Sequence, residues 1–250
     1  MKKIAIVKLS ALGDIVHAMV ALQFIKKQFP DSQIDWLVES GFAEVLAHNP
    51  HIHRILTVNL KAVKQNKIAI FNEIETVKSY AKNNYDIVID AQGLLKSAIT
   101  ARFLGKNIAG FDAKSIREPL ASFFYSHKIA SAYDSNTIDR NAAVLSQSLG
   151  FSISHDAIFD KEPFLFFEPP CVDFSSFLRS DLKNIVFVIG STWPSRNYPA
   201  EKFVDVANGL KQNCLIIWGN ENERIAAENM ARQSNFIRVM PALDLNDVKA

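Results

Sequence analysis

The sequence predicts an α/β protein with two Rossmann-like, doubly wound domains, each built on a parallel sheet. Short apolar runs rich in β-branched residues alternate with longer stretches of helical periodicity, which is the pattern of parallel strands covered by helices on both faces. At 250 residues the chain is long for one compact domain and natural for two. The expected strands are 4–9, 34–38, 54–58, 86–90, 184–189 and 214–218, and the expected helices are 15–28, 68–83, 94–104, 137–149, 200–211 and 221–233.

The segment 159–177 is predicted to connect the two domains. It carries Pro163, Pro169 and Pro170 and has no helical period. We therefore divide the chain near residue 165, into a first domain over 1–165 and a second over 166–250. The second domain is short for a doubly wound fold and ends in LDLNDVKA, where a further helix begins. We expect this domain to be incomplete.

Composition and charge narrow the class of protein. Hydrophobic residues make up 48% and charged residues 22%, with a formal net charge of +2, which is typical of a soluble globular protein and indicates no nucleic-acid partner. Cys171 and Cys214 are far apart, so neither a disulfide framework nor a zinc site is predicted, and a reducing cytoplasm fits best. Lys8 and Asp14 interrupt the apolar N-terminal region, which argues against a signal peptide. No run approaches the roughly 18 apolar residues of a membrane helix.

The stretch SALGD follows the first expected strand and carries Ser10, Gly13 and Asp14, with His17 one turn into the next helix. In open α/β sheets, ligands bind beyond the carboxyl ends of the strands. Gly13 would let a ligand approach the backbone, and the helix N-terminus favours an anion. Spacing alone leaves two interpretations of Asp14 open, an ordinary N-cap or a group that does chemistry. The fingerprint Gly-x-Gly-x-x-Gly is absent, which disfavours a nicotinamide-dependent oxidoreductase.

Two further loops follow expected strands and carry polar groups. DAQGLLKSA offers Gln92 and Lys96, which we expect at the same crevice as Asp14; a plain strand–turn–helix with a solvated lysine is the competing interpretation. GSTWPSRNYP is longer than most strand–helix loops, and its hydroxyl and guanidinium groups suit phosphate oxygens. WGNENER follows the next strand and offers the carboxylate of Glu223 as a site residue. The competing interpretation is that this acidic residue only stabilises the first turn of a helix. The phosphate-binding candidates in the longer loop are Ser191, Thr192 and Arg196.

Five segments, KLSALGDIVHAMVAL, DAQGLLKSA, REPLASFFY, STWPSRNYP and WGNENE, in this order, resemble the lipopolysaccharide heptosyltransferases. The pair DAQGLLKSA and REPLASFFY is most similar to the heptosyltransferase I group of that family. The resemblance implies a GT-B fold, in which two Rossmann-like domains face a cleft. It also implies an inverting transfer from ADP-L-glycero-D-manno-heptose to the Kdo of Kdo-lipid A, with no cofactor and no metal site of the Asp-x-Asp type.

The resemblance also implies roles for individual residues. Asp14 matches the family's general base, which favours chemistry over capping at this position. On the donor side, Ser191, Thr192 and Arg196 match phosphate-binding positions, Glu223 a ribose contact and Leu243 an adenine contact. The residues expected to bind the acceptor are Ser10, Gly13, His17, Gln92, Lys96 and Arg117.

The chain also departs from the family pattern. Val20 replaces a common proline, and a D-T-G-x-x-H segment expected to contact the donor is absent. We therefore expect cooperative folding only through about residue 165, weak binding of ADP and little transfer by a chain of this extent. The alternatives that remain are a heptosyltransferase II-type enzyme and a non-catalytic fragment that binds acceptor only.

Basic residues in the first domain suggest contact with an anionic glycolipid. Lys61, Lys64 and Lys67 lie close together in a connection without acidic residues. With apolar side chains such as Phe71, they predict peripheral association with the cytoplasmic face of the inner membrane. A solvated basic face is the competing interpretation. Further cations in this domain are Lys96, Arg117 and Lys128.

Overall fold

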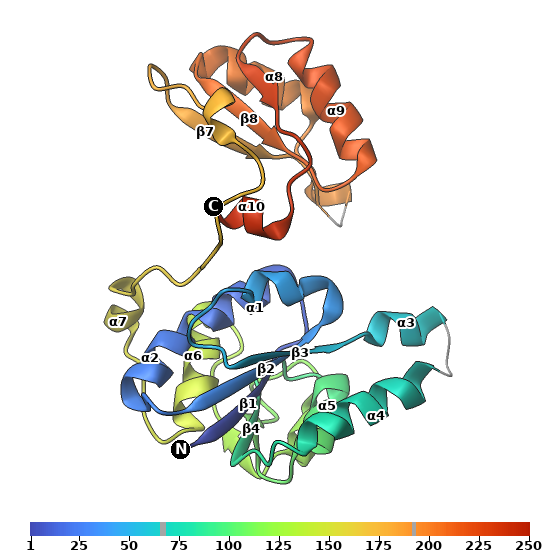
Figure 1. Ribbon diagram of the computed structural model, residues 1–250, viewed down its shortest axis with the longest axis vertical. Coiled ribbons are helices and arrows are strands. Elements are labelled where there is room, and N and C mark those ends of the chain that lie inside the picture. Colours follow the sequence, from blue (N-terminus) through green and yellow to red (C-terminus); the bar gives the residue numbers. More distant parts are fainter. Residues whose placement is uncertain (66–68, 192–193) are drawn as a thin grey trace. The chain divides into compact units, whose positions relative to one another are not determined.

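The computed structural model describes residues 1–65, 69–191 and 194–250 and divides the chain into two compact units, Met1–Phe166 and Phe167–Ala250. The division falls one residue beyond the expected 165. Each unit has its own parallel sheet, with helices connecting successive strands (Figure 1). Each unit is described by itself below.

Unit 1 contains a six-stranded sheet in the order β3-β2-β1-β4-β5-β6, in which every pair is parallel. The order reverses between β1 and β4, because the chain returns to the middle of the sheet after β3. This is the doubly wound arrangement, and its switch point lies between these two strands. The strands are β1 Lys3–Val7, β2 Gln33–Glu39, β3 Arg54–Val58, β4 Ile87–Asp90, β5 Ile108–Phe111 and β6 His127–Ile129.

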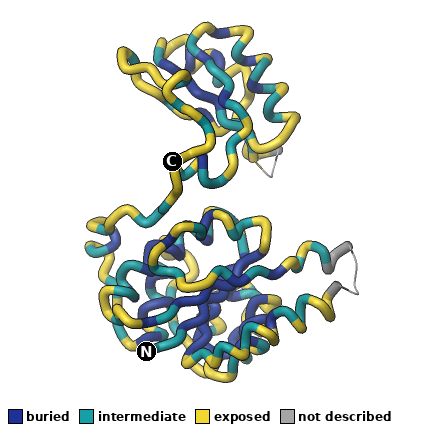
Figure 2. Tube along the Cα trace, in the orientation of Figure 1, coloured by how far each residue is buried: buried dark blue, intermediate teal, exposed yellow. Residues whose placement is uncertain are grey.

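Helices cover both faces of the unit 1 sheet (Figure 1). On one face α1 and α2 pack against α6; on the other, α5 packs against α4 and the 3₁₀ helix η2. Apart from their first residues, the middle strands β1 and β2 are therefore buried, and β4 is buried throughout, as Figure 2 shows in dark blue. The helical elements of unit 1 are α1 Leu12–Met19, α2 Ala21–Gln28, η1 Ser40–Leu46, α3 Leu60–Gln65, α4 Ala69–Ala81, α5 Leu95–Leu104, η2 Pro119–Phe124, α6 Thr137–Gln147 and α7 His155–Phe159.

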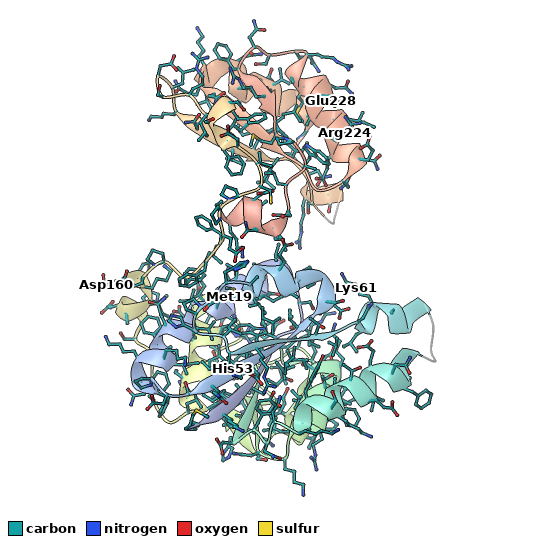
Figure 3. The ribbon with its side chains drawn as sticks, viewed as in Figure 1. Met19, His53, Lys61, Asp160, Arg224 and Glu228 are labelled. Atoms are coloured by element: carbon teal, nitrogen blue, oxygen red, sulfur yellow. The ribbon has the colours of Figure 1, made fainter. Side chains whose placement is uncertain are left out.

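Unit 2 has three described strands in the order β7-β8-β9, all parallel. Helices α8 and α9 pack together on one face, where side chains such as Val204, Ala207 and Met230 meet those of the strands. On the outer side of α9, Arg224 pairs with Glu228 one turn away (Figure 3). The elements are η3 Phe174–Ser176, β7 Asn184–Val188, η4 Pro194–Arg196, α8 Ala200–Leu210, β8 Asn213–Ile217, α9 Glu221–Ala231, β9 Ile237–Val239 and α10 Leu245–Lys249.

The expected strands and helices are present, most with shifted ends, except that the expected helix 15–28 is two helices, α1 and α2, which meet at Val20. The structure adds three strands that the sequence did not predict, β5, β6 and β9. These strands have three or four residues, too few for a clear period. β5 also contains Gly110, where an added Cβ would lie 2.6 Å from the Tyr125 ring. The ring packs against the backbone at Gly110, where a side chain would collide with it. Glycine has a low strand propensity, but the packing requires it at this position.

Candidate functional site

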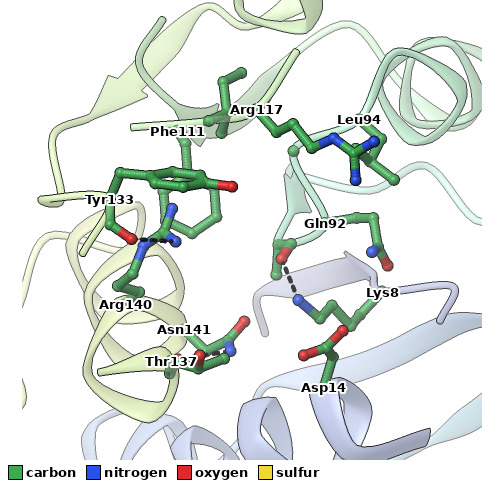
Figure 4. A pocket seen from close by; sticks show the side chains of 13 residues that line it. Lys8, Asp14, Gln92, Leu94, Phe111, Arg117, Tyr133, Thr137, Arg140 and Asn141 are labelled. Atoms are coloured by element: carbon green, nitrogen blue, oxygen red, sulfur yellow. Dashed lines mark hydrogen bonds between the residues drawn. The ribbon is translucent and has the colours of Figure 1, made fainter. Parts of the chain in front are cut away.

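A pocket of about 240 Å³ lies at the switch point of the unit 1 sheet. The loops after β1 and β4 form its floor, and residues from the β5–η2 and β6–α6 regions form its walls (Figure 4). We call it the switch-point pocket. Its polar side chains are those of Lys8, Asp14, Gln92, Arg117, Tyr133, Thr137, Arg140 and Asn141.

The carboxylate of Asp90, at the end of β4, organises the floor. It is fully buried and accepts hydrogen bonds from the backbone N–H groups of Gln92 (2.9 Å) and Gly93 (3.2 Å). The hydroxyls of Ser97 (2.8 Å) and Tyr125 (2.7 Å) donate to its other oxygen. Burial raises the pKa of Asp90, and these hydrogen bonds oppose the rise. The turn after β4 is therefore held by a buried acid with both oxygens in use.

Lys8, the first residue after β1, places a cation beside this turn. Its side chain is 6% exposed, and Nζ donates to the carbonyl oxygen of Ala91 at 2.8 Å. Burial lowers the pKa of Lys8, while the charges of Asp14 and Asp90 favour the protonated form. A buried ammonium group has three donors, and the described residues account for one of them.

Asp14 lies at the pocket as the third residue of α1. The N-cap of this helix is Ala11, so the N-cap interpretation of Asp14 is wrong. Instead, Oδ2 of Asp14 reaches back and accepts from the N–H of Ala11 at 3.3 Å, a contact that orients the carboxylate. Among the described residues Oδ1 has no hydrogen-bond partner. The side chain is partly buried and lines the pocket, where a ligand hydroxyl can reach it.

Gln92 joins the two floor loops. Its Oε1 accepts from the backbone N–H groups of Leu9 (3.0 Å) and Ser10 (3.1 Å). Ser10 therefore meets the site through its backbone. Gly13 is exposed, and a Cβ added there would meet nothing within 4 Å. The protein itself does not require a glycine at this position.

Arg140, on α6, builds the wall opposite. Its guanidinium donates to the carbonyl oxygens of Tyr133 (3.1 Å) and Ser115. It also stacks near the rings of Phe111 and Tyr133, with centroids at 5.3 and 4.9 Å. The wall therefore contains a cation that lies beside two aromatic rings.

The structure brings two of the expected acceptor residues, Gln92 and Arg117, to one pocket with Asp14, the expected general base. His17 does not line it; it is partly buried on α1, and its Nδ1 has no partner among the described residues. The prediction that Lys96 lies at the same crevice as Asp14 was wrong. Because Ser97 points inward to Asp90, the neighbouring Lys96 faces outward and lines a second cavity between α4 and α5.

Sequence reasoning missed Lys8, Arg140 and Asn141. A charged residue at the end of an apolar strand was the available signal for Lys8. Nothing in the local pattern of α6 distinguishes its pocket-lining residues from other polar residues of an amphipathic helix.

In unit 2, Glu223 lines a cavity of about 260 Å³. Its carboxylate accepts from the N–H of Gly219 (2.8 Å) and from Nδ2 of Asn220 (2.6 Å) at the start of α9. A Cβ at Gly190 would lie 2.1 Å from Oε1 of Glu223, so the loop after β7 approaches this carboxylate closely. Glu223 therefore fits both interpretations that the sequence left open, because it lies in the first turn of α9 and also lines the cavity.

The other donor candidates are not all in that cavity. Ser191 and Arg196 are exposed in the loop after β7. Leu243 lines a separate apolar groove with Val186 and Leu215, so the structure does not bring it to the cavity of Glu223. Thr192 lies outside the described residues. In the part of the chain that the structure describes, no cluster of three His, Cys, Asp or Glu residues could hold a metal ion. No described helix has the length and apolar character needed to cross a membrane.

A doubly wound sheet with a partly buried carboxylate at its switch point defines a class of α/β enzyme that acts on a polar substrate. Comparison with known proteins specifies the class. Residues 74–250 match the model of glycosyltransferase family 9 (heptosyltransferase), and the chain belongs to this family. It is a glycosyltransferase with the GT-B fold.

Relatives of known function match nearly the whole chain. The lipopolysaccharide heptosyltransferase 1 of Pseudomonas aeruginosa is 32% identical over 97% of this chain and 68% of its own length. That of Campylobacter coli is 32% identical over 98% and 74%. The solved structure of Escherichia coli heptosyltransferase WaaC with ADP-2-deoxy-2-fluoro heptose has a TM-score of 0.82 and 28% identity, covering 98% of this chain and 78% of that one. The expected family and fold class are confirmed.

Proposed function

We propose that this protein transfers L-glycero-D-manno-heptose from ADP-heptose to the Kdo of the lipopolysaccharide inner core, with inversion at the anomeric carbon. The observation that carries the proposal is the carboxylate of Asp14, oriented at the switch-point pocket beside the buried cation of Lys8. Two further facts support it: the relatives are named lipopolysaccharide heptosyltransferase 1, and the WaaC structure contains an ADP-heptose analogue.

The chemistry needs one base. Oδ1 of Asp14 takes the proton of an acceptor hydroxyl as the oxygen attacks the anomeric carbon of the heptose. The bond from that carbon to the phosphate oxygen breaks, and its electron pair leaves with ADP on the opposite face. Lys8 and the N-terminus of α1 place positive charge near the carboxylate of Asp14.

The donor belongs to unit 2 in this proposal. Arg196 would neutralise charge on the diphosphate, the hydroxyls of Ser191 and Thr192 would donate to its oxygens, and Leu243 would meet the adenine. Glu223 would accept from a ribose hydroxyl: each of its oxygens accepts one hydrogen bond from the described residues, and a carboxylate oxygen has two lone pairs. Negative charge that develops on ADP would thus be met by the guanidinium and hydroxyl groups of the loop after β7.

We also propose peripheral contact with the cytoplasmic face of the inner membrane. In unit 1, Phe71, Leu120 and Phe123 are 68%, 63% and 78% exposed, and Nζ of Lys128 lies 6.0 Å from the ring centroid of Phe123. Exposed rings with adjacent cations suit an anionic lipid surface. Binding to liposomes that is independent of both salt and anionic lipid content would contradict this contact.

Asp14→Asn tests the reaction. The amide keeps the shape of the side chain but cannot take up the proton, so we expect kcat to fall by about 10²- to 10⁴-fold, with ADP affinity unchanged. Transfer is measured with the protein expressed from its complete reading frame. Asp31→Asn, at an exposed carboxylate outside the pocket, is the control and retains full activity. Normal turnover of Asp14→Asn would refute the assignment.

The acceptor is tested separately. Kdo-lipid A and heptosyl-Kdo-lipid A are offered under identical conditions, and we expect transfer to the first. Preference for the second would make the protein a heptosyltransferase II-type enzyme.

A further inference from the structure

Asn141, the fifth residue of α6, is a buried polar side chain with one unused group. It is 2% exposed, and its Nδ2 donates to the carbonyl oxygen of Thr137 at 2.8 Å. That contact determines which end of the amide is the oxygen. The oxygen, Oδ1, is buried and has no hydrogen-bond partner in the described part of the chain. Leaving a buried acceptor unpaired is unfavourable, so a partner is missing from this position.

The unpaired oxygen faces the switch-point pocket. Asn141 lines the pocket together with Lys8 and Asp14. Figure 4 shows its amide oxygen turned away from Thr137, into the open space across from the ammonium group of Lys8. The described residues use one of the three donors of Lys8, the bond to Ala91. A free donor and a free acceptor therefore border the same space.

Arg140, next to Asn141, does not account for this acceptor. Its guanidinium donates to Tyr133 and Ser115 and stacks near two rings. It is committed to holding the pocket wall together, although its Nε is also buried without a partner. Asn141 thus differs from its neighbour, since its oxygen is not used by the fold.

We propose that Asn141 is a substrate-positioning and specificity residue: its Oδ1 accepts a hydrogen bond from one hydroxyl of the acceptor sugar, and Lys8 donates to the oxygen of that same hydroxyl. A hydroxyl donates once and can accept, so it satisfies both groups. Holding one hydroxyl at the α6 wall orients the ring so that a different hydroxyl meets Asp14. This inference rests on the proposed function, in which the pocket receives the acceptor.

The test is a double-mutant cycle in which one change is made in the protein and the other in the acceptor. Native protein and Asn141→Ala are assayed with Kdo-lipid A and with analogues that each lack one Kdo hydroxyl. We expect Asn141→Ala to raise KM for the acceptor by about fivefold to thirtyfold, the loss of one buried hydrogen bond, with KM for ADP-heptose unchanged. One deoxy analogue should carry a larger penalty with the native protein than with Asn141→Ala, because in the variant only the hydrogen bond from Lys8 remains to be lost. A merely structural role would leave every analogue's penalty the same in both proteins.

Asp139→Asn is the matched control, because Asp139 is also on α6, bonds His155 and does not line the pocket. Thermal unfolding and ADP binding establish that Asn141→Ala is folded; if it is not, Asn141→Ser replaces it. An acceptor KM within twofold of the native value, or no analogue whose penalty is smaller with Asn141→Ala than with the native protein, would overturn the inference while heptose transfer itself stands.

Failure of the proposed function looks different, since the native protein would then transfer no heptose to Kdo-lipid A. In that case free Kdo is titrated against both proteins by ligand-observed NMR. Binding to the native protein that Asn141→Ala abolishes still supports the inference, and equal binding or no binding overturns it.

Discussion

The two sheets of this protein differ in how many faces they bury. In unit 1, the side chains of β1 from Ile4 to Val7 are all fully buried, because helices cover both faces. In unit 2, Phe187 is buried against α8 and α9, while Val186 and Val188 on the other side of β7 are 55% and 66% exposed. An apolar parallel strand is therefore buried on both faces in unit 1 but on only one face in unit 2.

The two candidate sites differ in the same way. In unit 1 the polar groups at the strand ends are buried and held by hydrogen bonds within the fold, as those of Asp90 and Lys8 show. In unit 2 the partners of Glu223 are exposed backbone and side-chain groups. We infer that the switch-point pocket is organised before substrate arrives, because displacing its buried groups would leave charges unpaired.

The largest effect should come from Asp90. Asp90→Ala would leave its donors unsatisfied and Lys8 without a nearby buried counter-charge, so the free energy of unfolding of unit 1 should fall by about 3–5 kcal/mol. Hydrogen exchange of β1 and β8 amides reports the two units separately. In unit 2, Asp181→Ala removes an exposed ion pair with Arg179. This variant should leave the exchange rates of both the β1 and the β8 amides unchanged. Equal losses in both variants would contradict the contrast between buried and exposed charge.

A smaller effect is expected from a matched pair of valines. Val7 ends β1 and Val188 ends β7, each before a site loop, but Val7 is fully buried and Val188 is 66% exposed. Val7→Ala should lower the free energy of unfolding of unit 1 by about 2 kcal/mol. Val188→Ala should cost unit 2 less than about 0.5 kcal/mol. A comparable loss at Val188 would mean that the outer face of β7 is covered in solution.

The smallest effect concerns pH. All six histidines lie in unit 1, and burial, with the charge of Lys26, lowers the pKa of His51. Protonation of His51 therefore favours the unfolded chain. Its contribution to stability is complete above the unfolded value near 6.5 and is lost as pH falls through the lower folded value.

The measurement is urea unfolding between about pH 7.5 and 5.5. The other two tryptophans are replaced by phenylalanine, so that the fluorescence of Trp36 reports on unit 1 alone. Unit 1 should lose slightly more stability toward acid than the same protein with His51→Asn. Because His51 is only partly buried, the difference should be well below those of the two substitutions above. Parallel pH profiles would show that His51 does not contribute.

Much of the fold follows from local pattern. Strand 54–58 was predicted with the ends that β3 has, and helices 94–104 and 137–149 correspond closely to α5 and α6. Asp14 and Gln92 were identified because each follows an apolar strand, and in a parallel sheet such positions share one edge. Alternation of strands and helices, and polar residues at strand ends, are properties of neighbouring residues and can be recognised in the sequence.

Tertiary structure alone decided the rest. Pairing of β4 with β1 joins Val7 to Asp90 across the sheet, and this brings Lys8 and Ala91 within hydrogen-bonding distance. Packing of α6 against α1 brings Asn141 to the same pocket from far along the chain. The outward direction of Lys96 depends on the buried partner of Ser97. These placements arise from contacts between residues distant in sequence, and because no local propensity encodes such contacts, only the folded chain determines them.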